Sequence, residues 1–286
     1  MATGHNAGSG PRTKDEVVRA VQALPPLPAI ALRVMQVAQD PKSSAADLAV
    51  VVSADPGLSA TMLRVINSAA YRRQREVTSV QDALVMLGFV QARNIAISGA
   101  IAGSYAPDAL NALFRIDVFW RHSLSVAFRA SQLATESRKV DGPSAFTAGI
   151  VHNMGRLAIF FADPAGLDQA VAEAMRREAP LDEVEHELLG YDHAEIGELL
   201  AEKWRLPADV RSAVAHHHDE TGDLGPTLTS VVAAADRYCV SHGLLPGYVV
   251  PTARAEVGDA QFVKLKQQVD SLMELVNGQP AGVRFN

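Results

Sequence analysis

The sequence predicts an all-α fold in which an N-terminal helical bundle packs on a larger second bundle. Apolar residues recur at intervals of three and four along most of the chain, which is the spacing of one helix face. Prolines and capping residues separate these periodic segments. The alternation of apolar and polar residues that is typical of strands is rare.

The first elements follow a tail. Residues 1–12 are rich in Gly and Ser and lack helical periodicity, so we expect no helix there. A short helix is expected over 14–23. The next helix begins at Pro28, because proline suits a first helical turn, and it ends at Asp40 before a second proline. Its inward face is expected to carry Ile30, Val34 and Val37.

Capping patterns predict three further short helices in this half. Ser44 and Ser79 each stand three residues before an Asp, as in a capping box, and Asp55 precedes a first-turn proline. The helix after Asp55 is expected to bury Leu58, Met62, Val65 and Ile66. Another helix is expected over 89–102, after Gly88.

A second helical group is expected after a connection at 103–111. Its helices are predicted over 115–135, 144–161, 165–178, 181–189, 193–204, 207–219, 226–242 and 258–277. The expected organisation is a tail over 1–12, an N-terminal helical subdomain over 13–110, a second helical subdomain over 111–245, and a C-terminal helix and tail over 246–286.

Composition narrows the function classes. The formal net charge of −6 argues against nonspecific nucleic-acid binding, and the local basic cluster of Arg64, Arg72, Arg73 and Arg75 is read first as a solvated helix end. The single cysteine, Cys239, excludes an internal disulfide and fits a reducing compartment. We see no apolar leader and no run of 18 apolar residues, so we expect a cytoplasmic protein with no membrane partner.

Five of the predicted helices place a metal-ligand type of side chain on an apolar face. These residues are His122, His152 (followed by Asn153 and Arg156), His193, His217 with His218, and Asp236. Any one histidine is more often a hydrogen-bonded core residue, and 216–218 alone could be an exposed helix end. A buried carboxylate at Asp236, however, requires a cation, a histidine or several donors. Five such placements together favour one shared site.

The donor set indicates the chemistry of that site. Imidazole nitrogen together with carboxylate oxygen suits a divalent transition metal such as Zn, Mn or Fe better than Ca. A metal there would polarise a phosphate and lower the pKa of a bound water.

The order of these residues is similar to the ligand order of the HD superfamily of metal-dependent phosphohydrolases. The segment GIVHNMGRLAI resembles its His-Asp hallmark. The resemblance is closer to one branch, the HDOD (HD-related output domain) proteins. It is carried by LPPLPAIALRVM, SADPGLSATMLRVINSAAY, VTSVQDALVMLG and GYDHAEIGELLAEKWRLPADVRSAVAHHH, and covers about residues 20–240.

The resemblance implies an HD-like second bundle and a regulatory output domain of bacterial signal transduction without demonstrated hydrolysis. Such a domain would act through a signalling protein partner or a bound small ligand such as a nucleotide. The implied metal ligands are His122, His152, His193, His217, His218 and Asp236, with Asn153 and Arg156 beside them. No residue is assigned a catalytic role.

Two departures from an active HD site bear on catalysis. Asn153 stands where the superfamily has Asp, and an amide oxygen is a weaker ligand for a divalent ion. The segment HHHDETGDLGP lacks the tyrosine of the Gly-Tyr-Pro motif, so we expect no cyclic di-GMP hydrolysis. Binding of a single metal ion stays open.

Three alternatives remain at this point. The chain could be a residual metal-dependent phosphohydrolase acting on a nucleotide or phosphoester, with Arg156 neutralising phosphate, although Arg156 could equally lie at a surface helix end. Residues 55–68 could form an interface, but capping and packing are favoured. The 257–277 helix is expected to pack back on the bundle and not to form a dimer. Its apolar stripe is Phe262, Leu265, Val269, Leu272, Leu275 and Val276.

Overall fold

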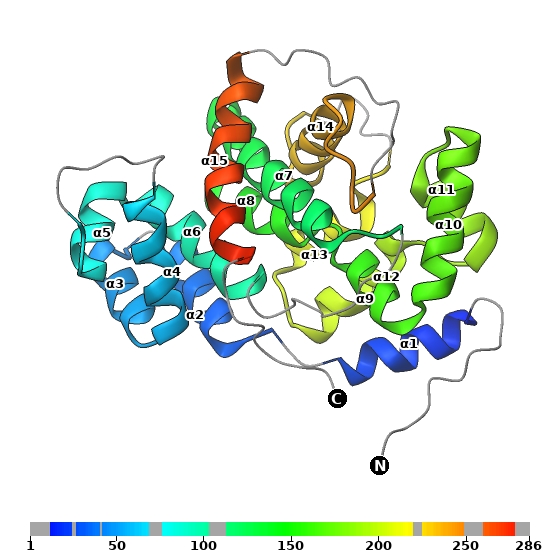
Figure 1. Cartoon of the computed structure of the whole chain (residues 1–286), viewed down its shortest axis with the longest axis horizontal. Coiled ribbons are helices and arrows are strands. Elements are labelled where there is room, and N and C mark those ends of the chain that lie inside the picture. The colour runs from blue at the N-terminus through cyan, green and yellow to red at the C-terminus, as the bar shows by residue number, and fades with distance from the viewer. Residues whose placement is uncertain are drawn as a thin grey trace.

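A computed structural model describes residues 12–24, 27–40, 42–68, 76–102, 113–219, 225–248 and 260–277. Within these ranges the regular structure is α-helical throughout, with no strand, so the predicted all-α fold is confirmed. Helices α2 to α6 form one group and α7 to α14 a larger one beside it (Figure 1).

The helices of the first half have the following bounds: α1 Lys14–Ala23, α2 Ala29–Gln39, α3 Ala45–Ser53, α4 Pro56–Asn67, α5 Val80–Leu87 and α6 Phe89–Ala102. The expected caps are present, because the side chains of Ser44, Asp55 and Ser79 each accept a hydrogen bond from the backbone N–H three residues later. The residues expected inside α4 are all buried, which agrees with a packing role for 55–68.

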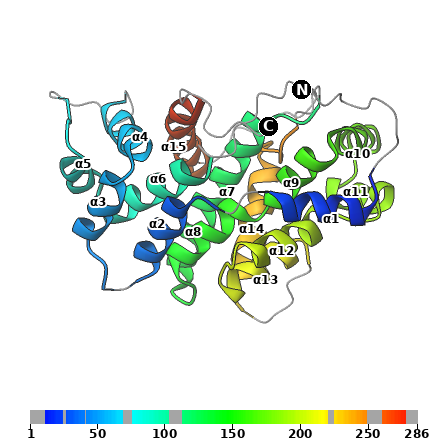
Figure 2. The ribbon, with the colours of Figure 1, turned by 90° about the horizontal axis from the view of Figure 1, so that it is seen from below.

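Two details of this half differ from the expectation. The buried face of α2 is Ala31, Val34, Met35 and Ala38, so Val34 is buried as predicted, whereas Ile30 and Val37 are only partly buried at the margin of this face. The small alanines face the core because α2 packs closely on α3 and α6. Helix α1 lies along α9 and α12 of the second group, as Figure 2 shows, although it precedes the first group in sequence.

The helices of the second half are α7 Ile116–Ser137, α8 Gly142–Val151, α9 Met154–Ala162, α10 Pro164–Arg177, α11 Leu181–Leu189, α12 His193–Lys203, α13 Ala208–His216, α14 Leu228–Ser241 and α15 Ala260–Asn277. The single helix predicted over 144–161 is wrong, because a turn at 152–153 divides it into α8 and α9. At Asn153 φ is −97° and ψ is 10°, and its carbonyl accepts from Arg156 three residues later, which interrupts the α-helical ladder.

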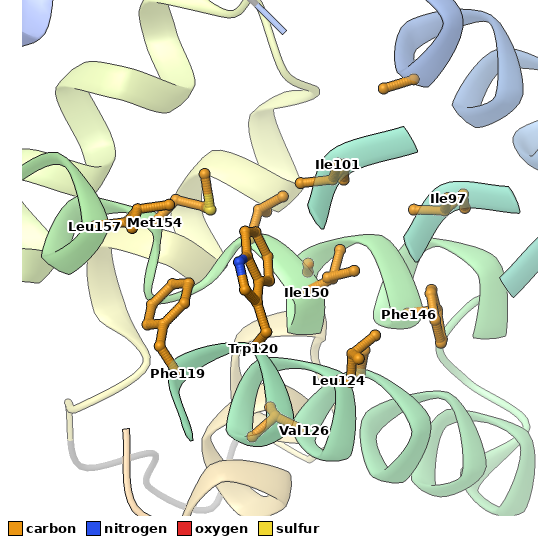
Figure 3. Packing of buried hydrophobic residues seen from close by; sticks show 14 of the residues in the cluster. Ile97, Ile101, Phe119, Trp120, Leu124, Val126, Phe146, Ile150, Met154 and Leu157 are labelled. Carbon is orange, nitrogen blue, oxygen red and sulfur yellow. The ribbon is translucent and has the colours of Figure 1, made fainter. Parts of the chain in front are cut away.

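The core is centred on the antiparallel pair α7 and α8. In Figure 3 the ring of Trp120 on α7 lies beside Ile150 of α8 and below Ile101 of α6, and the ring of Phe119 lies below Met154 and Leu157 of α9. The labelled neighbours are Ile97, Ile101, Leu124, Val126, Phe146, Ile150, Met154 and Leu157, all of them buried. Aliphatic side chains therefore fill most of the space between the helices, as the low aromatic content requires.

Helix α15 packs back on the chain, as expected. It lies against α7 of the second group and against α4 and α6 of the first, and Figure 1 shows it (red) crossing between the two groups. Its buried residues are Phe262, Leu265, Val269, Leu272 and Met273. An ion pair between Arg121 and Asp270 ties it to α7. The side chains of the predicted stripe residues Leu275 and Val276 lie outside the described part.

Some sequence predictions fall outside the described residues. These are the tail up to residue 11, the connection at 103–111, and Arg72, Arg73 and Arg75 of the basic cluster. Among the described residues one segment, 142–162, is long and apolar enough to cross a membrane. Since 94% of its window is buried inside the protein and the turn at 152–153 divides it, the segment has the character of a core helix.

Candidate metal centre

The six residues predicted to share a site lie together between four helices and one turn. His122 comes from the middle of α7, His152 from the turn after α8, and His193 is the first residue of α12. His217 and His218 follow the last turn of α13, and Asp236 lies in α14. Successive ring centroids along the row His122, His152, His217, His193 and His218 are 5.0–5.4 Å apart.

The row divides into two groups of three ligand atoms each. The carboxylate half consists of His122, His152 and Asp236, which are all buried. Oδ1 of Asp236 lies 3.0 Å from Nε2 of His122 and 3.8 Å from Nε2 of His152. None of these three atoms is aligned for a hydrogen bond. The three atoms face a common point but do not form hydrogen bonds with one another.

The histidine half consists of His193, His217 and His218. Nε2 of His193 lies 3.2 Å from Nε2 of His217 and 3.0 Å from Nε2 of His218. Ligand nitrogens around a tetrahedral zinc ion are about 3.3 Å apart, so the spacing is close to that of a metal site. His193 and His217 are buried, whereas His218 is exposed on one side.

Contacts to backbone carbonyls fix the tautomers of three histidines. Nδ1 of His122 lies 2.7 Å from the Leu244 carbonyl oxygen, and Nδ1 of His152 and of His217 contact carbonyls three residues earlier at 2.7 and 2.8 Å. A carbonyl oxygen only accepts, so Nδ1 carries the proton in each ring. Nε2 is therefore left with a lone pair directed into the cluster, which is the usual arrangement of metal-binding histidines.

Glu185 of α11 belongs to the site, and sequence reasoning missed it. This side chain is fully buried, with Oε2 2.6 Å from Nδ1 of His193 and Oε1 2.8 Å from Nε of Arg156. It accepts the His193 ring proton and so leaves Nε2 of His193 free. The sequence did contain a signal for this residue. Glu185 follows Leu181 by four residues, which places its carboxylate on the inward face of the helix.

The structure decides the position of Arg156. The residue is 1% exposed, so the alternative of a surface helix end is wrong. Burial alone would lower the pKa of its guanidinium, but the charge of Glu185 outweighs burial and raises it. Asp219, which follows the histidine run, lies at the surface and contacts the exposed His216 at 3.0 Å.

The protonation states favour cation binding. Burial lowers the pKa of His152, and lowers those of His193 and His217 well below 6.5, so all three rings are neutral near pH 7. The cluster therefore combines these three neutral imidazoles with the carboxylate of Asp236.

A cavity of about 330 Å³ opens beside the cluster. Its lining includes Asn153, Arg156, Asp182, His218, Asp236 and Arg237. Oδ1 of Asn153 and Nη1 of Arg156 are buried there without a hydrogen-bond partner. A larger groove of about 560 Å³ lies between α6, α7 and α15 and contains none of the predicted site residues.

These residues fit a divalent metal ion. Buried polar atoms that lack partners are costly, and here the carboxylate half leaves three of them around one point. A metal bound by two imidazoles and a carboxylate would satisfy all three. The His and Asp groups could thus hold a metal, while the geometry by itself does not select which one.

Comparisons with known proteins agree with the fold. The family model described as HDOD domain matches residues 24–220. An uncharacterized protein of Treponema pallidum (strain Nichols) is 24% identical over 204 residues, which are 70% of this chain and 38% of that protein. The chain spans less than two fifths of the length of the first relatives that it matches.

Two solved structures share the architecture. An HDOD domain protein of unknown function from Geobacter sulfurreducens has a TM-score of 0.67 at 23% identity, over 92% of this chain and 93% of that one. The protein named "Putative phosphohydrolase" from Shewanella amazonensis SB2B has a TM-score of 0.67 at 27% identity, over 91% and 98%.

Proposed function

Since the chain belongs to the HDOD domain family, we propose that it is a metal-holding regulatory output domain of bacterial signal transduction and not an efficient hydrolase. The observation that carries this proposal is the combination of the His and Asp ligand cluster with Asn153, which follows His152 and lines the cavity beside the cluster. An amide oxygen carries no charge with which to bridge two metal ions or to accept a proton from water. The cluster would hold its helices together around a cation.

The donor set supports one ion of Zn, Mn or Fe, because soft or borderline first-row metals prefer imidazole nitrogen. His122, His152 and Asp236 would hold it, with His193, His217 and His218 as the further candidate ligands. When bound, such a metal supplies a Lewis acid toward a phosphate oxygen. The protein's own residues fix the ring orientations and exclude water from the buried side.

The regulatory role would be exerted through a signalling protein partner or a small ligand. The cavity beside the cluster supports the second route, because Arg156 and Arg237 line it and are suited to an anionic ligand such as a nucleotide. The net charge of −6 gives no support for a nucleic-acid partner. Binding of the ligand at this cavity would be sensed at the ends of α9 and α14, which carry the two arginines.

A second candidate function is residual hydrolysis of a nucleotide or phosphoester. The arginine-lined cavity next to the ligand cluster favours it, as does the 27% identity to the Shewanella protein. In this case Nη1 of Arg156, which is buried without a hydrogen-bond partner, would neutralise phosphate charge. The absence of a carboxylate at position 153 counts against efficient turnover.

Metal analysis and turnover assays separate the two candidates. For protein purified without chelator we expect bound metal but no hydrolysis of cyclic dinucleotides or generic phosphoesters. Asn153→Asp should bind metal more tightly, because a carboxylate replaces the amide. His216→Ala, which changes an exposed neighbouring histidine, should keep the wild-type metal content. Wild-type turnover that disappears in His152→Ala would establish the enzyme, and background metal in every variant would refute the metal site.

A further inference from the structure

The two halves of the cluster differ in which of their polar atoms lack a hydrogen-bond partner. In the carboxylate half, the three facing atoms of His122, His152 and Asp236 have no aligned hydrogen bond. In the histidine half, Nε2 of His193 accepts, because Nδ1 of that ring faces Glu185. Nε2 of the exposed His218 lies 3.0 Å from it, and a neutral imidazole can carry its proton on that nitrogen. The carboxylate half therefore has three facing atoms without an aligned hydrogen bond, whereas the histidine half has a ring that can donate to His193.

A positive charge already occupies the histidine half. Nη2 of Arg156 lies 2.7 Å from Nδ1 of His193 and 3.3 Å from its Nε2. A guanidinium only donates and is always charged, so the Nδ1 proton of His193 belongs to its contact with Glu185 at 2.6 Å. Arg156 is therefore a fixed cation next to the nitrogen that a second metal would need.

Formal charges give the same asymmetry. The carboxylate half contains the carboxylate of Asp236, whose negative charge attracts a divalent ion. In the histidine half the ligands are imidazoles, and the nearest carboxylate, Glu185, is already paired with Arg156 at 2.8 Å. Asn153 follows His152 and lines the cavity beside the cluster, but its amide has no charge with which to bridge two ions.

We propose that the cluster is built for a single metal ion in the carboxylate half, and that the Arg156 guanidinium, anchored by Glu185, takes the place of a second ion beside His193. The inference rests on the proposed metal-holding function and assigns the bound metal to the carboxylate half of the cluster. Arg156 and Glu185 are then the residues that determine the number of metal ions bound.

Titration of Zn²⁺ into the metal-free full-length chain, with metal content measured in parallel, tests the proposal. Wild-type protein should bind one ion per chain. His122→Ala should weaken this binding by more than the roughly 10- to 100-fold that the loss of an outer partner costs, whereas His217→Ala should keep one ion. The double variant Arg156→Met with Glu185→Gln should bind two, because three neutral histidines are a sufficient zinc ligand set.

The double variant is chosen because Arg156→Met alone leaves a buried unpaired carboxylate and could fail to fold. Its helical circular dichroism should match the wild type. Two ions in the wild type, or one ion in the folded double variant, would overturn the inference and leave the metal-holding function standing. The inference would also be overturned if the protein bound a single ion that His122→Ala retained and His217→Ala lost. No ion in the wild type would overturn both.

Discussion

At the scale of single residues, burial holds three histidines of the cluster, His152, His193 and His217, in their neutral form. Each of these rings donates its one N–H to a backbone carbonyl or to Glu185. The low polarity of the surroundings opposes the uptake of a second proton. The neutral form suits a metal but costs stability in acid, because an unfolded histidine is free to take up a proton. The pH dependence of the free energy of unfolding therefore reports on the protonation of the cluster.

We expect the metal-free protein to lose stability as the pH falls from 7 to 5.5. Burial holds the pKa of His152, His193 and His217 below 6.5, whereas the unfolded rings titrate near that value. Below about pH 6.5 the unfolded state therefore binds more protons, and the free energy of unfolding falls by at most about 1.4 kcal/mol per pH unit for each histidine. The lowered pKa of Asp236 affects the free energy of unfolding only near and below pH 3.8, which is outside the range of pH 5.5 to 7.

Urea denaturation at several pH values in the presence of a chelator measures this slope. His217→Asn should reduce it, since one of the buried rings is removed. His216→Asn, at the exposed neighbouring position, should leave it unchanged. A free energy of unfolding that does not vary over this pH range would contradict the buried neutral state of the three rings.

At the scale of the elements, two glycines allow the helices that carry the ligands to approach closely. A Cβ at Gly149 of α8 would lie 2.6 Å from the Cα of Ala127 on α7. A Cβ at Gly155 of α9 would overlap the carbonyl oxygen of His193 and lie 2.5 Å from the N of Gly197 on α12. Because the opposing atoms are backbone, neither position has room for a side chain.

Gly155→Ala should lower the free energy of unfolding by at least about 2 kcal/mol, because α9 and α12 would be forced apart. The same shift would displace His193 and weaken any metal bound through it. Gly142→Ala is the matched control, since a Cβ there meets the hydroxyls of Thr135 and Ser131 at 3.4 and 3.5 Å and the Ser131 carbonyl oxygen at 3.7 Å, all ordinary contact distances. We expect the control to be neutral or more stable by up to about 1 kcal/mol in chemical denaturation. Equal stabilities of the two variants would argue against the close contact of α9 and α12.

At the scale of the whole molecule, α15 joins the two helical groups. It contacts α4 and α6 on one side and α7 on the other, and α7 carries His122. The relative position of the first group and the metal centre therefore depends on this one helix as well as on the packing of α2 and α6 against α8. A partner that moved α15 would act on both groups at once.

Leu272→Ala should destabilise the protein by about 2–5 kcal/mol, because Leu272 is 2% exposed and its loss leaves a cavity under α15. Val263→Ala on the same helix is the control, since Val263 is 47% exposed, and should change stability by no more than about 0.5 kcal/mol. Thermal unfolding of both variants measures the difference. Similar melting temperatures for the two would mean that α15 does not pack in this way.

The sequence by itself determined which segments are helices and which residues are out of place on them. Caps such as Ser44 and Asp55 and the three-to-four periodicity are local signals, and the helices follow them closely. The same periodicity identified the five histidines and Asp236, because a ligand-type side chain on an apolar face is visible within one helix. The replacement of Asp by Asn153 was also legible without a structure.

Only the tertiary structure decided how these residues are grouped. The division into a carboxylate half and a histidine half depends on contacts such as His122 with the carbonyl of Leu244, 122 residues away. The pairing of Arg156 with Glu185 spans 29 residues and decided between the two positions that the sequence left open for this arginine, which is a buried cation. The turn at Asn153 and the position of α1 on the second group have the same origin. Such contacts are made between separate helices, and helical periodicity contains no information about which faces meet.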